Sequence, residues 1–238
     1  MGPGMRATPA EHKAMDTAVR SHFTHDLKRL EQATVALGEE AQRAIRRAME
    51  SLRWRDLALA RGVVEHDRTI DERRWEIEEQ ATALIATQQP AASDLRTVLA
   101  IVHIVTELER IADHGEGIAR ISLLLDSASL PQPISRLEEM AALGIEMMRR
   151  SLQAFLARDA QLARAVCTRD DTLDALYEAN HAEVFGRMLL EPQQAKLLTY
   201  QLWTSHNLER IGDRATNICE RVAYLVTGRI SDLHVSRY

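Results

Sequence analysis

The chain has 238 residues and a formal net charge of −5, with 45% hydrophobic and 27% charged residues. These values are typical of a folded globular protein with one or two domains, and they exclude an intrinsically disordered chain. Ten glycines and six prolines supply few tight turns, which disfavours an all-β fold, and the charge lacks the basic surplus typical of a nucleic-acid-binding protein.

Hydrophobic residues at helical spacing predict an all-α fold built from six helices. The first residues are polar and include two prolines, so we expect a disordered tail over 1–15. A second short polar tail is expected over 229–238. The predicted helices cover residues 16–51, 56–87, 93–125, 134–156, 159–190 and 192–228.

Local turn chemistry sets the expected helix ends. Short polar side chains at a helix start can accept hydrogen bonds from the first free N–H groups. Pro192 is expected to open the sixth helix, where its missing N–H has no cost, and Gly228 is expected to end it. The expected N-caps of the second, third and fifth helices are Asp56, Ser93 or Asp94, and Asp159.

A linker divides the chain into two halves. Residues 126–133 contain two prolines and small polar residues, which are typical of a connecting segment. On this basis the first half covers 16–125 and the second covers 134–228. Each half then contains three predicted helices.

Two matched blocks indicate an internal duplication. The sequence Leu-Glu-Arg-Ile-Ala-Asp at 108–113 recurs as Leu-Glu-Arg-Ile-Gly-Asp at 208–213, and the Asp-x-x-x-Asp motif at 67–71 recurs at 170–174. Blocks that recur in the same order are typical of repeated structural units. The sequence therefore predicts two tandem, similar three-helix bundles.

Pairs of carboxylates at i, i+4 carry the chemistry of this sequence. The pairs are Asp67 with Asp71, Glu109 with Asp113, Asp170 with Asp174, and Glu209 with Asp213. Like charges at this spacing share one helix face and destabilise an isolated helix by roughly 0.2–0.5 kcal/mol per pair. Two pairs on adjacent antiparallel helices would surround one small volume, which suits a cation such as Mg²⁺, Ca²⁺, Mn²⁺ or iron. Alternatively, Arg110, Arg210 and Arg214 neutralise the acids on a solvated face.

Other candidate sites have weaker support. Glu178-x-x-His181 matches half of a di-iron motif, but the repeat does not supply a second copy. His22 and His25 are expected on a solvated helix face. The single histidines His103 and His206 are expected to be structural rather than metal ligands.

Cysteines and apolar segments bear on the compartment. Cys167 and Cys219 are far apart in sequence and form no metal-ligand pattern, so we expect two small buried side chains and a reducing compartment. The longest apolar stretch, residues 98–105, is too short to cross a bilayer. These observations predict a cytoplasmic protein.

No phosphate-binding loop, dinucleotide-binding glycine motif or nucleophile elbow is present in the sequence. We therefore predict that the chain is not an enzyme. Two alternatives stay open: a carboxylate-bridged metalloenzyme that activates water for hydrolysis, and a helical interaction protein that binds no metal.

Over about residues 20–228 the chain resembles the PhoU family of phosphate-signalling proteins. The resemblance rests on the duplicated three-helix layout, the two Leu-Glu-Arg-Ile-(Ala/Gly)-Asp segments, the Asp-x-x-x-Asp segments, and Gln-Pro-x-x-x-Asp-Leu-Arg at 89–96. The first half departs from the family pattern, because Gly117 stands where the second half has Asn217 and Ala112 replaces the glycine.

The resemblance implies a cytoplasmic, dimeric negative regulator at the inner face of the membrane. Such a protein restrains phosphate uptake and the phosphate-starvation response through the Pst phosphate transporter and a sensor histidine kinase. Some family members hold clusters of iron or zinc on Glu/Asp-x-x-x-Asp motifs, so the resemblance implies divalent or trivalent metal ions, with manganese and magnesium as further candidates. The implied ligands are Asp67, Asp71, Glu109, Asp113, Asp170, Asp174, Glu209 and Asp213.

Overall fold

The computed structural model describes residues 9–126, 128, 130–132 and 134–229. Within these residues the structure consists of six α-helices and one short 3₁₀ helix, and it contains no strand. The elements are α1 (Pro9–Trp54), α2 (Leu57–Gln88), α3 (Ala92–Leu125), α4 (Ser135–Ala157), α5 (Ala160–Leu190), η1 (Pro192–Gln194) and α6 (Ala195–Thr227).

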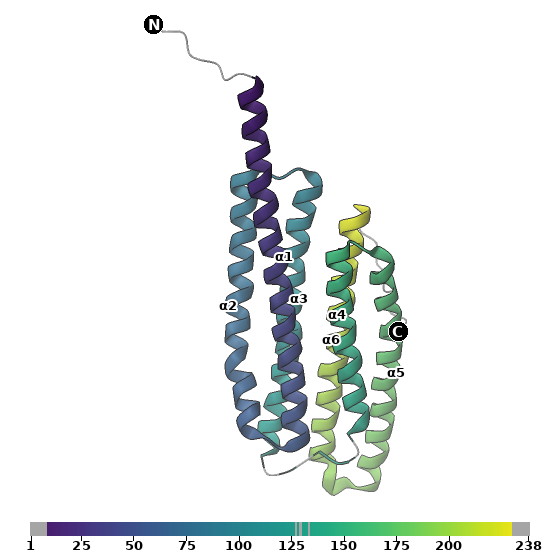
Figure 1. Ribbon diagram of the computed structural model, residues 1–238. Coiled ribbons are helices and arrows are strands. Elements are labelled where there is room, and N and C mark those ends of the chain that lie inside the picture. The colour runs from purple at the N-terminus through teal and green to yellow at the C-terminus, as the bar shows by residue number, and fades with distance from the viewer. Residues whose placement is uncertain (1–8, 127, 129, 133, 230–238) are drawn as a thin grey trace.

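The helices form two three-helix bundles that lie side by side (Figure 1). Helices α1, α2 and α3 pack together in the first bundle, and α4, α5 and α6 pack together in the second. The bundles meet where α3 packs on α6 and α1 packs on α4, while α2 and α5 lie on the outer sides. This arrangement confirms the predicted all-α fold of two similar bundles.

The second bundle is inverted relative to the first. Polar contacts between α3 and α6 show this relation. Glu107 on α3 contacts Arg214 on α6, and the equivalent residues of the other half, Asn207 on α6 and His114 on α3, contact each other. Asn217 donates from Nδ2 to Oε2 of Glu107 at 3.0 Å, and Nδ1 of His114 lies 3.1 Å from Oδ1 of Asn207. A Cβ at Gly117 would lie 2.9 Å from Oδ1 of Asn207, so the glycine that replaces an asparagine here leaves room for that side chain.

Helix α1 begins earlier than predicted. It starts at Pro9, so residues 9–15, expected as part of a disordered tail, are helical. Proline is favourable in the first turn of a helix, and the alanine, glutamate, lysine and methionine that follow are strong helix formers. Residues 1–8 lie outside the described residues, as do residues 230–238 of the predicted second tail.

Two other helix starts also differ from the prediction. Helix α3 begins at Ala92 after Ala91, which makes no side-chain cap hydrogen bond, so neither Ser93 nor Asp94 is the N-cap. Asp94 instead lies in the first turn, where the helix dipole favours a carboxylate. Pro192 opens the 3₁₀ turn η1, and α6 starts three residues later because the chain first forms this tighter turn.

The repeated Arg-Asp turns are confirmed. Asp56 accepts a hydrogen bond from the N–H of Leu59 at 2.9 Å, and Asp159 accepts from the N–H groups of Gln161 and Leu162, both at 2.9 Å. The arginine before each aspartate has a positive φ, which ends the preceding helix and turns the chain. Gly228 ends α6 in the left-handed conformation, as predicted.

Cys167 and Cys219 are both buried and form no disulfide, which confirms the prediction of two small buried side chains. Although far apart in sequence, they meet where α5 packs on α6, and their side chains hydrogen-bond to each other. This hydrogen bond and burial raise the pKa of the Cys219 thiol. Among the described helices, none combines the length and apolar character that a bilayer span requires.

Candidate functional site

The first carboxylate cluster lies between α2 and α3. Asp67 and Asp71 project from α2, and Glu109 and Asp113 project from α3. One carboxylate oxygen from each of Asp67, Asp71 and Asp113 lies within 4.8 Å of the other two. Within the part of the chain that the structure describes, this is the one group of His, Cys, Asp or Glu ligand atoms gathered so closely.

Glu109 belongs to the same cluster but has a cationic neighbour. Nε of Arg74 lies 3.5 Å from Oε1 of Glu109, and the same guanidinium donates to Glu78 at 2.7 Å. The structure therefore brings three of the four predicted first-half ligands together and leaves Glu109 beside Arg74.

Three carboxyl groups of the first cluster, those of Asp67, Glu109 and Asp113, have a raised pKa. Burial, together with the charges of Asp113, Glu116 and Asp71, raises the pKa of Asp67 to about 7. Burial and the neighbouring Asp71 also raise the pKa of Asp113, while burial and Asp113 raise that of Glu109 against the opposing charge of Arg74. Neighbouring negative charges contribute to each of these three shifts, and a cation would relieve the same repulsion.

Glu116 is an acidic member of this neighbourhood that the sequence analysis did not identify. It raises the pKa of both Asp67 and Asp113 by its charge, and it forms an ion pair with Arg120 at 2.5 Å. The equivalent position in the second half is Thr216, so comparison of the two repeats does not identify Glu116. Its i, i+3 spacing from Asp113 was the available signal.

The second cluster, between α5 and α6, is more deeply buried. Asp170 is only 1% exposed, and burial followed by the charges of Asp174 and Asp213 raises its pKa to about 7. Gly212 makes this burial possible. A Cβ at position 212 would lie 2.8 Å from Oδ1 of Asp170 and 2.3 Å from Cδ2 of Leu173, so α6 can approach this closely only with glycine there.

The α6 members of the second cluster have basic side chains as neighbours. Arg210 donates to Oδ2 of Asp213 at 2.6 Å. Glu209 lies 3.7 Å from Nδ1 of His206, and burial with the charge of Asp213 raises the pKa of Glu209 to about 7 despite Arg210. The charges of Asp174, Glu209 and Asp213 all act on Asp170, so the four predicted second-half residues are electrostatic neighbours, with Asp213 already paired to Arg210.

The equivalent arginine has a different partner in the first half. Arg110 donates to Glu107 at 2.9 Å rather than to Asp113. Arg214 also donates to Glu107, at 3.4 Å across the seam between the bundles. The alternative in which arginines neutralise the acidic pairs therefore holds for Arg210 and Asp213, whereas Arg110 and Arg214 both bind Glu107.

The weaker candidates from the sequence lie in other environments. The ring of His181 lies 4.2 Å from that of Tyr177 and 5.9 Å from that of Phe185, so it packs among aromatic side chains. Glu178 is exposed, as are His22 and His25, which agrees with the predicted solvated face.

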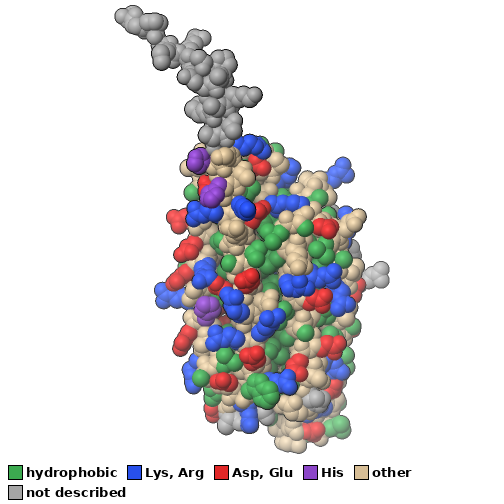
Figure 2. All heavy atoms as spheres, viewed as in Figure 1, with side chains coloured by type: hydrophobic (Ala, Val, Ile, Leu, Met, Phe, Trp, Pro, Cys, Tyr) green, Lys and Arg blue, Asp and Glu red, His purple; other side chains and the backbone are tan. Residues whose placement is uncertain are grey.

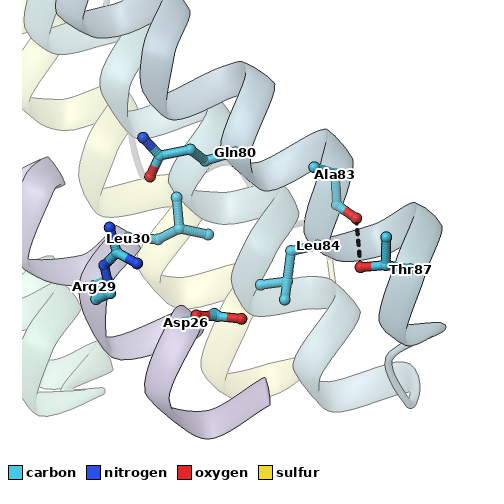
Figure 3. A pocket seen from close by; sticks show the side chains of 7 residues that line it. All are labelled: Asp26, Arg29, Leu30, Gln80, Ala83, Leu84 and Thr87. Atoms are coloured by element: carbon cyan, nitrogen blue, oxygen red, sulfur yellow. Dashed lines mark hydrogen bonds between the residues drawn. The ribbon is translucent and has the colours of Figure 1, made fainter. Parts of the chain in front are cut away.

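A small hollow between α1 and α2 holds none of the eight carboxylates (Figure 3). Leu30 and Leu84 form its buried apolar part, and Asp26 and Arg29 lie at its edge. Thr87 donates its hydroxyl hydrogen bond to the carbonyl of Ala83 within α2. The hollow is therefore separate from both carboxylate clusters.

The residues of both clusters fit a cation chemically. All eight predicted donors are carboxylates, which are the ligands of magnesium, manganese and iron, and zinc accepts them as well. Partial burial and mutual repulsion raise the free energy of the metal-free carboxylates. The first cluster has the closer oxygen atoms, and the second has the deeper carboxylate.

Comparison with known protein families finds the same domain in both halves of the chain. The model of the PhoU domain matches this chain at residues 34–122 and again at 137–222, once in each bundle. The chain belongs to the PhoU family. The two PhoU matches coincide with the two structural bundles, so the internal duplication is also a duplication of the family domain.

Relatives in several bacteria carry the same name. The protein from Clostridium acetobutylicum is 36% identical over 90% of this chain and 99% of its own length, and the Rhizobium meliloti protein is 32% identical over 88% and 89%. Both are named phosphate-specific transport system accessory protein PhoU homolog.

Solved PhoU structures share this fold. The Pseudomonas aeruginosa PhoU structure superposes with a TM-score of 0.83 at 32% identity, covering 87% of this chain and 100% of that one. PhoU from Streptococcus pneumoniae, titled a phosphate transport system regulatory protein, also has a TM-score of 0.83 at 32% identity, with 88% and 99% covered. These relatives are named as accessory and regulatory proteins and not as enzymes, which supports the prediction that the chain is not an enzyme over the metalloenzyme alternative.

Proposed function

We propose that this chain is an accessory regulator of a phosphate-specific transport system. In this role it restrains phosphate uptake and the phosphate-starvation response, as a cytoplasmic adaptor between the Pst phosphate transporter and a phosphate-sensing histidine kinase. The names of its relatives support the transport role. The helical surfaces of the two bundles provide the area that an adaptor needs to bind two partners.

The observation that carries the regulatory proposal is the pair of carboxylate clusters, one in each bundle. Three oxygens lie within 4.8 Å in the first cluster, and in the second the charges of Asp174 and Asp213 act on the buried Asp170, so each cluster concentrates negative charge that a cation would offset. We propose that iron, zinc, manganese or magnesium binds there through the eight predicted ligands. When bound, such a cation supplies positive charge and cross-links two helices of a bundle.

Cation binding would change the contacts of the residues around each cluster. In the first bundle, Asp67 and Asp71 on α2 lie close to Asp113 on α3, so a cation bound by all three would fix the spacing of these helices. In the second bundle, Asp213 must exchange Arg210 for the cation. A change in helix spacing or in the position of Arg210 would alter the surfaces offered to partner proteins.

Metal content tests the ligand proposal. We would measure metal by plasma mass spectrometry in protein purified without chelator, and in Asp71→Ala/Asp113→Ala/Asp174→Ala/Asp213→Ala. We expect more than about one metal ion per chain in the wild type and a loss in the variant. The matched control is Glu72→Ala/Glu76→Ala, an exposed i, i+4 pair on α2 that should retain metal. Equal metal content in all three, or none in any, would contradict the ligand proposal and favour the metal-free interaction protein.

Phosphate-dependent gene expression tests the regulatory proposal separately. In a host that lacks its own PhoU protein, the wild-type gene should restore repression of a phosphate-starvation promoter in high phosphate. The fourfold alanine variant should restore less repression, and the Glu72→Ala/Glu76→Ala control should match the wild type. Failure of the wild type itself would overturn the regulatory role, whereas equal repression by both variants would overturn only the link to metal.

We also propose that the chain forms a homodimer and reaches the membrane through its protein partners. Light scattering coupled to size-exclusion chromatography measures the mass directly, and the expected value is twice that of one chain. A mass equal to one chain across the micromolar range would contradict the dimer.

A further inference from the structure

A groove of about 500 Å³ runs between α1 and α4, where the two bundles meet away from the seam of α3 and α6. Val35, Met148, Leu152 and Leu156 provide apolar surface along it, and Leu156 is 49% exposed. Figure 2, which faces α1 and α4, shows hydrophobic side chains along this junction with Lys and Arg side chains on both sides. The groove contains none of the eight carboxylates.

The edges of the groove are basic although the chain is acidic overall. Three arginines and one glutamate line it, a local surplus of two positive charges (3 − 1) in a protein with a net charge of −5. Arg43 has Glu39 and Glu40 at 3.9 and 3.8 Å. Among the ion pairs of the described residues, none includes Arg46 or Arg149, and both side chains are exposed. The guanidinium of Arg46 donates to the side-chain oxygen of Gln42 at 2.8 and 3.0 Å, which is an uncharged partner, so no carboxylate in the groove neutralises either arginine.

Arg46 and Arg149 are equivalent residues of the duplication. They are 103 positions apart, the same shift that relates the two Arg-Asp turns at 55–56 and 158–159. Because the second bundle is inverted, the equivalent arginines come from opposite walls of one groove. The two bundles together thus make a concave surface with an apolar floor and a cation on each side.

We propose that this groove binds an amphipathic, acidic α-helix of a partner protein. Apolar side chains of that helix would contact Val35, Leu152 and Leu156, and its flanking aspartates or glutamates would pair with Arg46 and Arg149. A helix that lays its apolar face into a groove is a recurrent mode of peptide recognition, and opposite charges on the two sides set its specificity.

The dimensions of the groove fit such a helix. Its lining extends from residue 35 to residue 46 along α1, which is about 16 Å at 1.5 Å per residue. A helix of about three turns covers this length and presents apolar residues at i, i+4, i+7 and i+11. A lipid bilayer is too flat to enter the space between two helices in this way. Binding of such a helix in the groove requires neither a metal ion nor a particular transporter or kinase.

Fluorescence polarisation with two designed helical peptides tests the proposal. Both peptides have leucine at i, i+4, i+7 and i+11, one has glutamate at the flanking positions, and the other has lysine there. We expect the full-length chain to bind the glutamate peptide at least about tenfold more tightly than the lysine peptide, with affinity falling as salt is raised. Equal affinity for both peptides, or no binding of the glutamate peptide at about 1 mM, would overturn the proposal.

Charge-reversal variants locate the binding. Arg46→Glu/Arg149→Glu should weaken binding of the glutamate peptide by about tenfold or more. The matched control is Arg47→Glu/Arg150→Glu, an equally repeated arginine pair adjacent in sequence but outside the groove lining. Equal losses in both variants would overturn the assignment to this groove. Stronger binding of phosphatidylglycerol vesicles than of the glutamate peptide, lost in the first variant only, would assign the groove to lipid and overturn the helical partner.

Discussion

The two carboxylate clusters share one motif, but their surroundings differ. In the first, Arg110 binds Glu107 and leaves Asp113 close to Asp67 and Asp71. In the second, the position of Glu107 is occupied by Asn207, and Arg210 binds Asp213 instead. A residue three positions before the arginine thus decides which carboxylate it neutralises.

The clusters also differ in depth because of a single side chain. Ala112 in the first half corresponds to Gly212 in the second, and the absent Cβ lets α5 and α6 bury Asp170. Asp67, the equivalent of Asp170, is only partly buried. Identical i, i+4 spacing therefore specifies where the carboxylates lie, while neighbouring residues set their pKa, ion pairing and access.

Replacing Gly212 should break the comparison most strongly. In Gly212→Ala the new Cβ would collide with Leu173 and Asp170, and overpacking of this kind costs about 2 kcal/mol. We expect Tm to fall by roughly 4–8 °C for a chain of this size. The reciprocal change Ala112→Gly should cost only about 1 kcal/mol, the difference in helix propensity. A Gly212→Ala protein as stable as the wild type would show that the helices are not held at this distance.

Changing Glu107 should make the first cluster resemble the second. In Glu107→Gln, Arg110 loses its charged partner and is expected to turn to Asp113, which weakens cation binding by about 1 kcal/mol, or about fivefold. Calorimetric titration with Mn²⁺ in an Asp174→Ala/Asp213→Ala background reports the first cluster alone. Adding Arg110→Ala to Glu107→Gln should restore the affinity, and failure to do so would locate the effect elsewhere.

The raised pKa of Asp67 predicts a pH dependence of stability in metal-free protein. Its pKa is about 7 in the fold against an ordinary 3.8, so between these values the folded state binds more protons than the unfolded state. The unfolding free energy should therefore fall as pH rises through this window. Asp67→Asn should make the unfolding free energy less dependent on pH, and the loss over the whole window should shrink by less than about 1 kcal/mol after solvent screening. Thermal unfolding at several pH values measures it, and an unchanged slope would contradict the assignment.

The smallest expected effect is the difference between the two repeated helix caps. Asp56→Ala and Asp159→Ala each remove an N-cap and should cost about 1 kcal/mol or less. Asp159 accepts from two N–H groups and Asp56 from one, so the second loss should be larger by a few tenths of a kcal/mol. Urea unfolding of the two variants measures the difference, and the reverse order would contradict it.

Periodicity and repetition were sufficient to predict the fold. Long amphipathic segments predicted the helices, and the Leu-Glu-Arg-Ile blocks with their preceding Asp-x-x-x-Asp motifs predicted two similar bundles. The start of α1 was predicted less well, because two prolines near the N-terminus were read as a tail although Pro9 can occupy a first helical turn.

The immediate environment of the clusters could not be predicted in the same way. The partner of each arginine depends on how α3 meets α6, and on whether position 107 or 207 carries a charge. Glu116 is not repeated, so comparison of the halves did not select it. The basic groove required knowledge that the second bundle is inverted, since only then do Arg46 and Arg149 come to one cavity.

The inverted seam between α3 and α6 also bears on the origin of the molecule. A symmetric dimer of single bundles must present the same residue on both sides of its axis, so any substitution appears twice. Within one duplicated chain the two positions are inherited separately. The contact of Glu107 with Asn217 and Arg214, and that of Asn207 with His114, are the products of this freedom. A duplicated chain can therefore carry an acid, Glu107, on one side of the seam between α3 and α6 and an amide, Asn207, at the equivalent position on the other side.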